Sequence, residues 1–222
     1  MKQTPVHDGY NNDLLALIPS DARLVVEAGS SSGALAKAYK ALNPQCKYVG
    51  IEVDSDYVEL SERYCDTVLS VDLNQSGETA LSELTDVDCW VFGDVLEHLI
   101  DPWKLLQRVR SSLSENGCVT ACIPNMQHWS IQLKLNSGAL WYEDTGLLDK
   151  THLRWFTRQT IIELFTSSGY RITAGQSRVF ESEDHQKMLE VVRNIAELTG
   201  ANPDQSVADA SALQYVVKAV RA

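Results

Sequence analysis

The sequence predicts an α/β fold built on a parallel sheet. Two observations predict it. Short apolar, β-branched runs alternate with helical patterns, and the first run is followed by a glycine-containing turn that opens a helix. Strands joined through helices pair in parallel by right-handed crossovers. At 222 residues and 44% hydrophobic content the chain can bury one sizeable core, so we expect a single domain over residues 1–222.

Strands and helices alternate regularly through the first half of the chain. Residues 1–20 form an N-terminal segment whose helix, Tyr10–Ile18, ends at Pro19. The predicted strands that follow are Arg23–Ala28, Lys47–Val53, Thr67–Val71 and Asp88–Phe92. The predicted helices between them are Ala34–Leu42, Tyr57–Tyr64 and Gly77–Leu84.

An insertion interrupts this alternation in the second half. Asp101 is placed to cap a helix over Pro102–Leu113, with Pro102 in its first turn. The later predictions are a strand at Gly117–Ile123, the insertion at Pro124–Arg154, a helix at Thr157–Ser167, a strand beginning at Tyr170–Thr173, a helix at Gln186–Thr199, a loop at Gly200–Ser206 and a strand at Leu213–Val220. The insertion is rich in aromatic residues, and we expect it to determine specificity, because binding residues concentrate on irregular segments over a rigid sheet.

Charge and composition exclude some partners. The net charge is -11 and no block of Lys or Arg is present, which argues against nucleic acid as a partner. The N-terminus has no apolar leader and no apolar run approaches bilayer length, so we expect no membrane insertion and a cytoplasmic location. Five cysteines without a CxxC pair predict buried, reduced thiols.

The turn after the first strand is the main candidate for ligand binding. It contains Gly29, Ser30, Ser31 and Gly33, and it follows a strand that carries Glu27 near its end. Glycine permits a tight turn and a close ligand approach, and the helix start behind it presents unpaired N–H groups. The turn by itself is compatible with dinucleotides, with S-adenosylmethionine and with simple chain reversal.

The acids that follow the later strands narrow this choice. The order Glu27-x-Gly29-x-x-x-Gly33, then Glu52, Asp72 and Asp94 after successive strands, resembles class I S-adenosylmethionine-dependent methyltransferases over nearly the whole chain. The resemblance implies a Rossmann-like, doubly wound, mostly parallel seven-stranded sheet with helices on both faces and a reversed last hairpin. It departs from the usual loop at Ser31, which replaces the middle glycine. A nicotinamide cofactor fits less well, because the loop lacks the GxGxxG order.

The resemblance also implies a set of cofactor-binding residues. They are Glu27, Gly29, Ser30, Ser31, Gly33, Glu52, Val53, Asp72, Leu73 and Asp94. Glu52 is placed to accept hydrogen bonds from both ribose hydroxyls, and Asp72 to accept one from the adenine amino group. Glu27 would orient the loop and meet the cationic methionine portion. The alternatives are a solvated strand-end acid for Glu52 and an ordinary turn aspartate for Asp72.

A second stretch, Phe92–Trp103, resembles a narrower branch of these enzymes. The branch contains ubiquinone-pathway O-methyltransferases and methyltransferases associated with bacterial surface polysaccharides. Pro124-Asn125, Thr145–Arg154 and Phe156-Thr157 strengthen the second association. The implied activity is methyl transfer from S-adenosylmethionine to a small-molecule or sugar-like acceptor, at oxygen. The alternative is a non-catalytic cofactor-binding scaffold, motivated by Ser31.

Three interpretations remain open for the residues after the fourth strand. His98 or His152 could act as a general base on the acceptor, because the imidazole pKa lies near neutrality. A weaker alternative is a divalent metal held by Asp94, Glu97, His98 and His152, which is similar to the pattern in small-RNA 2′-O-methyltransferases and ubiquinone O-methyltransferases. The third is that Glu97 and His98 only cap and pack a turn.

Overall fold

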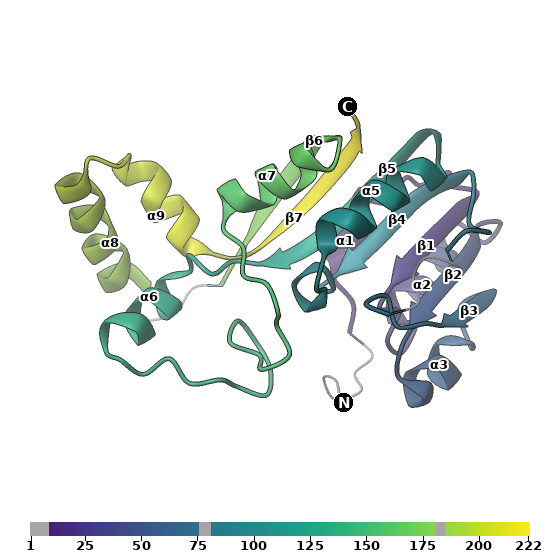
Figure 1. Cartoon of the computed structure of the whole chain (residues 1–222), viewed down its shortest axis with the longest axis horizontal. Coiled ribbons are helices and arrows are strands. Elements are labelled where there is room, and N and C mark those ends of the chain that lie inside the picture. The colour runs from purple at the N-terminus through teal and green to yellow at the C-terminus, as the bar shows by residue number, and fades with distance from the viewer. Residues whose placement is uncertain (1–8, 76–80, 181–184) are drawn as a thin grey trace.

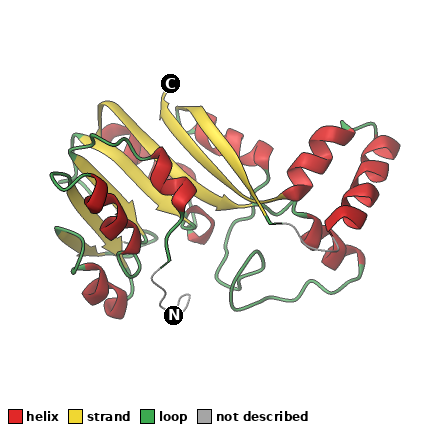
Figure 2. Ribbon diagram, turned by 180° about the vertical axis from the view of Figure 1, so that it is seen from behind, coloured by secondary structure: helices red, strands yellow, loops and turns green. Residues whose placement is uncertain are grey.

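The apolar runs form one sheet. The computed structural model describes residues 9–75, 81–180 and 185–222, and within them seven strands are hydrogen-bonded side by side (Figures 1 and 2). The strands are β1 (Leu24–Ala28), β2 (Lys47–Glu52), β3 (Thr67–Ser70), β4 (Val87–Gly93), β5 (Leu113–Pro124), β6 (Tyr170–Val179) and β7 (Ala212–Arg221). Their spatial order is β3-β2-β1-β4-β5-β7-β6.

The pairing directions confirm the predicted topology. β1 pairs in parallel with β2 and β4, and β4 pairs in parallel with β5. β7 runs antiparallel to both β5 and β6, which is the reversed last hairpin. The chain proceeds outward from β1 to β3 and then returns to β4, so the strand order reverses between β1 and β4. Ligands of doubly wound sheets bind at the carboxyl ends of the strands at such a reversal.

Helices cover both faces of the sheet, as predicted. They are α1 (Asn12–Leu17), α2 (Ala34–Leu42), α3 (Ser55–Ser61), the 3-10 helix η1 (Leu96–His98), α5 (Pro102–Ser112), α6 (Trp129–Asn136), α7 (Arg158–Ser167), α8 (His185–Thr199) and α9 (Pro203–Ser211). Alternating side chains of β4 supply both cores. Trp90 and Phe92 pack in the cluster that contains α5 and α7, and Cys89 and Val91 pack in the one that contains α1 and α2.

Several predicted boundaries were wrong. α3 begins at Ser55 rather than Tyr57, because the Asp54 side chain caps the helix by accepting from the Asp56 N–H at 2.9 Å. Of the helix predicted over Gly77–Leu84, residues 77–80 lie outside the described residues and the remainder forms a turn.

Two further corrections concern the second half. β5 begins at Leu113, ahead of the predicted Gly117, because Leu113 pairs with Val87 across a register shift. The predicted loop at Gly200–Ser206 contains the start of α9. The Asn202 side chain caps that helix by accepting from the Gln205 N–H at 3.0 Å.

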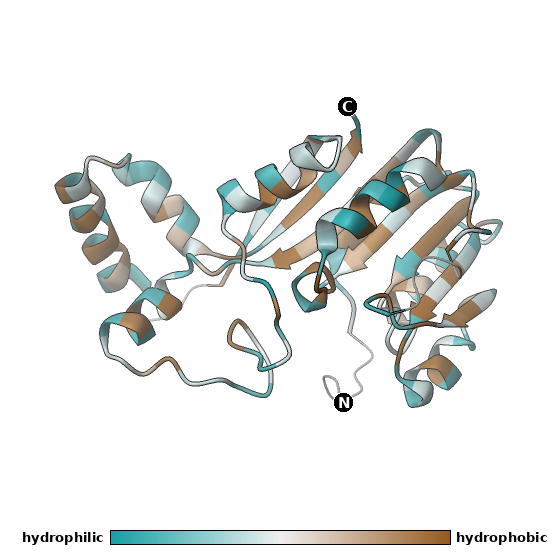
Figure 3. Cartoon of the chain, in the orientation of Figure 1, coloured by the Kyte–Doolittle hydropathy of each residue, from teal (hydrophilic) through white to brown (hydrophobic). Residues whose placement is uncertain are grey.

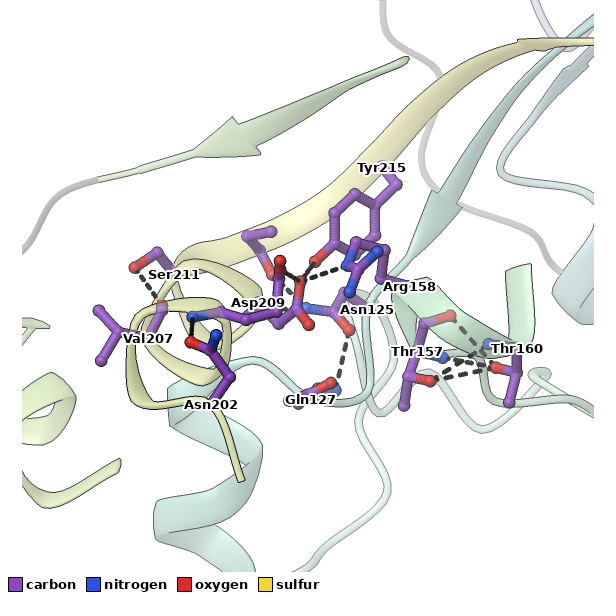
Figure 4. A network of polar contacts seen from close by, with 12 residues as sticks. Asn125, Gln127, Thr157, Arg158, Thr160, Asn202, Val207, Asp209, Ser211 and Tyr215 are labelled. Carbon is purple, nitrogen blue, oxygen red and sulfur yellow. Dashed lines mark hydrogen bonds and ion pairs between the residues drawn. The ribbon is translucent and has the colours of Figure 1, made fainter. Parts of the chain in front are cut away.

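The helices α6, α8 and α9 form a lobe at the end of the sheet remote from β3 (Figure 1). A buried polar network fastens α9 to the sheet (Figure 4). Asp209 Oδ1 accepts hydrogen bonds from Arg158 Nε at 2.8 Å and from the Tyr215 hydroxyl at 2.9 Å. The Asn125 amide donates to the Asp209 carbonyl at 2.7 Å. These contacts join α9, α7, β7 and the start of the insertion.

Two predictions made from composition concern the state of the cysteines and the presence of membrane-spanning segments. All five cysteines are buried and free of disulfides, as predicted. Among the helices in the described ranges, none combines the length and the apolar character that a bilayer crossing requires.

Candidate functional site

The loop between β1 and α2 has the conformation of a glycine-rich turn. Gly29, Ser31 and Gly33 all have positive φ, at 69°, 47° and 76°. A Cβ atom on Gly29 would lie 2.6 Å from Cγ2 of Val95, so the residue after β1 has no room for a side chain. Ser31 adopts the left-handed conformation without being glycine. Replacing the middle glycine by serine therefore leaves the turn geometry intact.

Glu52 connects this loop to the end of β2. Its carboxylate is buried, and Oε2 accepts from the Ser31 N–H at 2.9 Å. Oε1 accepts from the N–H groups of Val53 at 2.8 Å and Asp54 at 3.1 Å. A carboxylate oxygen has two lone pairs, so Oε1 is fully used by these two donors and Oε2 can accept one further hydrogen bond. The side chain of Val53 is exposed.

Glu27 lies beneath the loop in β1 and is buried. The Tyr48 hydroxyl of β2 donates to its Oε2 at 3.0 Å. Burial raises the pKa of Glu27 to about 8, and the charge of Glu52 adds to the effect although the Tyr48 hydrogen bond opposes it. At neutral pH most of the Glu27 carboxyl is protonated, and a cation bound beside it would favour its ionisation.

The residues after β3 form a turn. Asp72 Oδ1 accepts from the Asn74 N–H at 2.8 Å, the geometry of an Asx turn, and Leu73 packs against the core. Asn74 fixes this turn to the segment after β4. Its amide donates to the His98 carbonyl at 3.1 Å and accepts from the Ile100 N–H at 2.8 Å.

Asp94 follows β4 and is exposed, with φ of 54°. Its Oδ1 accepts from the Gln214 amide of β7 at 2.5 Å. The carboxyl ends of β1, β2, β3 and β4 thus bring Glu52, Asp72 and Asp94 to one edge of the sheet.

Three other predicted residues meet beside this edge. Glu97 and His98 lie in η1 and His152 lies in the insertion, and one ligand atom from each lies within 4.8 Å of the others. The two imidazole rings are edge to face with centroids 4.7 Å apart. Asp94, the fourth residue of the predicted metal set, is outside this group. The insertion therefore folds back onto η1.

Glu97 is the unusual member of this cluster. Its side chain is 0% exposed, and neither carboxylate oxygen has a hydrogen-bond partner among the described residues. His152 Nε2 lies 3.9 Å from Oε1, which is too long for a hydrogen bond. Ionising a buried carboxyl group that has no hydrogen-bond partner is costly, which favours its neutral form.

In both histidines Nδ1 faces a backbone carbonyl, and Nε2 has no hydrogen-bond partner among the described residues. Nδ1 of His152 is 3.3 Å from the Leu147 carbonyl, and Nδ1 of His98 is 3.2 Å from the Thr151 carbonyl. A carbonyl only accepts, so these contacts assign the ring proton to Nδ1 and a lone pair to Nε2. Asp149 supports the arrangement by accepting from the Thr151 hydroxyl at 2.7 Å.

The protonation states follow from burial. Burial lowers the pKa of His98, and burial together with the charge of His98 lowers the pKa of His152. Burial, reinforced by the charge of Asp94, holds the pKa of Glu97 well above its usual range. The Glu97–His152 pair is therefore neutral at pH 7 rather than an ion pair. Two neutral imidazoles with free Nε2 atoms beside one carboxyl group can accept a proton or ligate a cation.

Several residues at this edge were missed from the sequence. Asn74 and Gln214 hold the loops after β3 and β4, and Asp149 and Thr151 orient His98. Asp149 and Thr151 lie in the stretch Thr145–Arg154, which carried a family resemblance without a role for either residue. No local pattern marked Gln214, because its partner is distant in the sequence.

Part of this chain is similar to a known protein family. Residues 26–119 match the family model described as a methyltransferase domain. No curated protein sequence matches the chain.

Solved structures share the fold. An S-adenosylmethionine-dependent methyltransferase from Archaeoglobus fulgidus is 18% identical, with 92% of this chain and 88% of that chain covered and a TM-score of 0.62. One from Mesorhizobium loti is 15% identical, with 94% and 95% covered and a TM-score of 0.61. An O-methyltransferase from Brevibacillus brevis, in complex with S-adenosyl-L-homocysteine, is 16% identical, with 95% and 71% covered and a TM-score of 0.61. The family model covers less than half of the chain, and the likeness to the solved structures shows that this chain shares their fold.

Proposed function

We propose that this protein transfers a methyl group from S-adenosylmethionine to an oxygen of a small-molecule or sugar-like acceptor. The observation that carries the proposal is the juxtaposition of the Gly29–Gly33 loop, after β1, with the Glu97, His98 and His152 cluster, after β4. β1 and β4 are parallel neighbours, so both features lie at the same edge of the sheet. The family match and the fold of its structural neighbours support the same class.

In this proposal the residues at the carboxyl ends of β1, β2 and β3 hold the cofactor. S-adenosylmethionine supplies an activated methyl group on a sulfonium. The loop N–H groups face its carboxylate, Glu27 faces its cationic end, Glu52 accepts from the ribose and Asp72 from the adenine amino group. The positive φ of Ser31 supports this role for the loop, because the turn keeps the conformation that glycine would adopt.

The cluster of Glu97, His98 and His152 holds the acceptor. His98 or His152 accepts the proton of the acceptor hydroxyl at Nε2 as the methyl group moves in line. Their lowered pKa values keep both rings neutral, which a general base requires. Positioning supplies most of the rate, so one base is sufficient. The insertion, residues 124–154, would enclose the acceptor.

A second candidate function for the same cluster is divalent cation binding. Glu97, His98 and His152 would be the ligands, and the unpaired carboxylate oxygens with two free Nε2 atoms support it. A bound cation would lower the pKa of a coordinated acceptor hydroxyl. Glu97 must lose its proton to ligate, so affinity should rise with pH. Elemental analysis and calorimetric titrations with Mn²⁺ at two pH values test this, and no bound metal at either pH contradicts it.

Calorimetry with S-adenosylhomocysteine tests the cofactor half. Wild type should bind, and Glu52→Ala should weaken binding at least about 10-fold, by loss of ribose contacts and of the loop anchor. Glu59→Ala, at an exposed carboxylate on α3, is the matched control and should bind as wild type does. Undetectable binding to wild type would favour the non-catalytic scaffold instead.

Release of S-adenosylhomocysteine tests the reaction. A panel of hydroxyl- and amine-bearing acceptors should reveal turnover with a hydroxyl compound. His98→Ala and His152→Ala should then reduce kcat by about 100-fold or more while cofactor affinity is retained. Unchanged kcat in both variants, or turnover confined to amines, would contradict the assignment. Loss of turnover on chelation, restored by added metal, would favour the cation over the general base.

A further inference from the structure

A chain of polar side chains ends at Asp94, on the edge of the sheet that carries the glycine-containing loop. Gln214 lies near the start of β7, opposite Pro124 at the carboxyl end of β5, and Arg178 lies opposite Gln214 in β6. The Gln214 side chain donates from Nε2 to Oδ1 of Asp94 at 2.5 Å and accepts at Oε1 from Nη1 of Arg178 at 2.5 Å. Nε of Arg178 lies 3.3 Å from Oδ2 of Asp13 in α1. Contacts between side chains therefore connect α1, β6 and β7 to the first residue after β4.

Arg178 determines how the Gln214 amide is oriented. A guanidinium group only donates hydrogen bonds, so it requires the amide oxygen of Gln214 and leaves the amide NH2 group for Asp94. The guanidinium is itself held in place. Its Nε pairs with Asp13, and its central carbon lies 5.3 Å from the centroid of the Phe180 ring. The position of the Asp94 carboxylate is thus set from β6 through β7.

This chain is not part of the apolar packing that stabilises the sheet. The central strands are apolar along most of their length (Figure 3), and their side chains form the two cores. Gln214 and Arg178 are half-buried and Asp94 is exposed. Asp94 also has a positive φ of 54°, a conformation that costs energy in residues with a Cβ atom and is concentrated at functional sites. These properties indicate a role at the edge of the sheet.

Asp94 lies between the loop after β1 and the cluster that contains Glu97. Val95, the next residue, packs so closely against Gly29 that a Cβ atom on the glycine would lie 2.6 Å from the valine Cγ2. On the other side, the charge of Asp94 adds to the effect of burial in raising the pKa of Glu97. A group that passes from a cofactor at the loop to an acceptor at the cluster therefore starts beside Asp94.

We propose that Gln214 and Arg178 are positioning residues that hold the Asp94 carboxylate toward the sulfonium of S-adenosylmethionine. This inference rests on the proposed function. The product, S-adenosylhomocysteine, has a neutral thioether in place of the sulfonium, so a carboxylate beside it favours the charged cofactor over the neutral product. Selectivity of this kind is a difference between two affinities, and it promotes the exchange of product for fresh cofactor.

Calorimetric titrations of the full chain with S-adenosylmethionine and, separately, with S-adenosylhomocysteine test the inference. Asp94→Asn and Gln214→Leu should each lower the affinity for S-adenosylmethionine about 10-fold more than the affinity for S-adenosylhomocysteine. The two ligands differ only in the transferred methyl group and its charge, so a variant that merely disturbs the structure weakens both alike. Gln176→Leu, at an exposed residue of β6, is the matched control and should leave both affinities unchanged. Circular dichroism and melting temperature establish that each variant is folded.

Two further variants test whether Gln214 and Arg178 act through Asp94. The double variant Asp94→Asn with Gln214→Leu should show the same selectivity as Asp94→Asn alone, and additive losses would contradict the inference. Arg178→Met should also lose selectivity, although the direct effect of removing a positive charge would be tighter binding of the cationic cofactor. Wild type that binds neither ligand would overturn both this inference and the proposed function. Wild type that binds both, with selectivity unchanged in Asp94→Asn or Gln214→Leu, would overturn this inference alone.

Discussion

Ser31 illustrates how a single residue can retain a geometry that its type disfavours. Its φ of 47° belongs to the left-handed region, where a Cβ atom crowds the following carbonyl. The residue is nevertheless held there by its N–H hydrogen bond to Glu52 and by glycines on either side of the turn. The loop therefore stores local strain that glycine would relieve.

Replacing Ser31 by glycine should stabilise the protein. Removal of Cβ relieves about 1–2 kcal/mol of strain, and greater freedom in the unfolded chain offsets about 0.5–1 kcal/mol of it. We expect a net rise of about 0.5–1 kcal/mol in the free energy of unfolding, measured by urea denaturation. Ser137→Gly is the control, because Ser137 has φ of -87° and should only lose stability. A destabilised Ser31→Gly would show that the side chain makes a compensating contact.

The raised pKa of Glu27 should make the free energy of unfolding depend on pH. Its pKa is about 8 in the folded protein and close to 4.5 when exposed, so the unfolded chain loses this proton first as pH rises. The group therefore lowers the free energy of unfolding progressively between these values. The full effect is on the order of 3–5 kcal/mol, at about 1.4 kcal/mol per unit of pKa difference.

Glu27→Gln should remove this dependence. The variant should match wild type near pH 4 and become the more stable of the two as pH rises, with the gap levelling off above pH 8. Urea denaturation across this range measures the gap. Glu59→Gln, on the exposed surface of α3, should show no comparable gap. A constant difference between Glu27→Gln and wild type at all pH values would mean that Glu27 ionises normally.

At the scale of elements, α9 shows what local patterns can and cannot predict. Asn202 followed by Pro203 is a helix-start signal, and the structure has the helix α9 there although the sequence predicts a loop over Gly200–Ser206. The helix is secured by tertiary contacts, since Asp209 accepts from three side chains on α7, α9 and β7 (Figure 4). Such contacts have no local signature.

Asp209→Ala should detach α9 from the sheet. It leaves Arg158 and Tyr215 without their shared acceptor in a buried setting, which should cost about 2–4 kcal/mol of the free energy of unfolding. Asp204→Ala, on the same helix, removes an acceptor that is 87% exposed and pairs with Arg193. That control should cost no more than about 0.5–1 kcal/mol. Equal costs would show that the network does not fasten the helix.

At the scale of the whole molecule, stability should be graded from the sheet to the lobe. β1 and β4 are buried on both faces between two apolar cores, whereas α8 buries only His185, Val192 and Ala196. Segments with few buried apolar contacts open locally at lower free energy. The lobe should therefore open without unfolding the sheet.

Amide hydrogen exchange followed by mass spectrometry tests this gradation. At dilute concentration, peptides from β1 and β4 should exchange slowest, and peptides from α8 and α9 should exchange by a faster local opening. Equal protection of α8 and β4 in dilute protein would indicate one cooperative unit.

The sequence by itself determined the sheet and one part of the candidate site. Buried strands carry continuous apolar runs, and their ends carry polar residues, so the positions of Glu27, Glu52, Asp72 and Asp94 at one edge follow from local pattern and parallel pairing. The role of the loop glycines can also be predicted from local sequence, because the tight turn itself requires residues that readily adopt positive φ.

Only the tertiary structure decided how Glu97, His98 and His152 come together. His152 reaches His98 because the insertion folds back onto η1, where the N–H groups of Leu153 and Arg154 donate to the Glu97 carbonyl at 2.8 and 2.9 Å. Along that path the buried Glu97 carboxylate and both Nε2 atoms have no hydrogen-bond partner among the described residues. These features depend on contacts between segments that are distant in the sequence, and the free energy of such contacts is not encoded in any local periodicity.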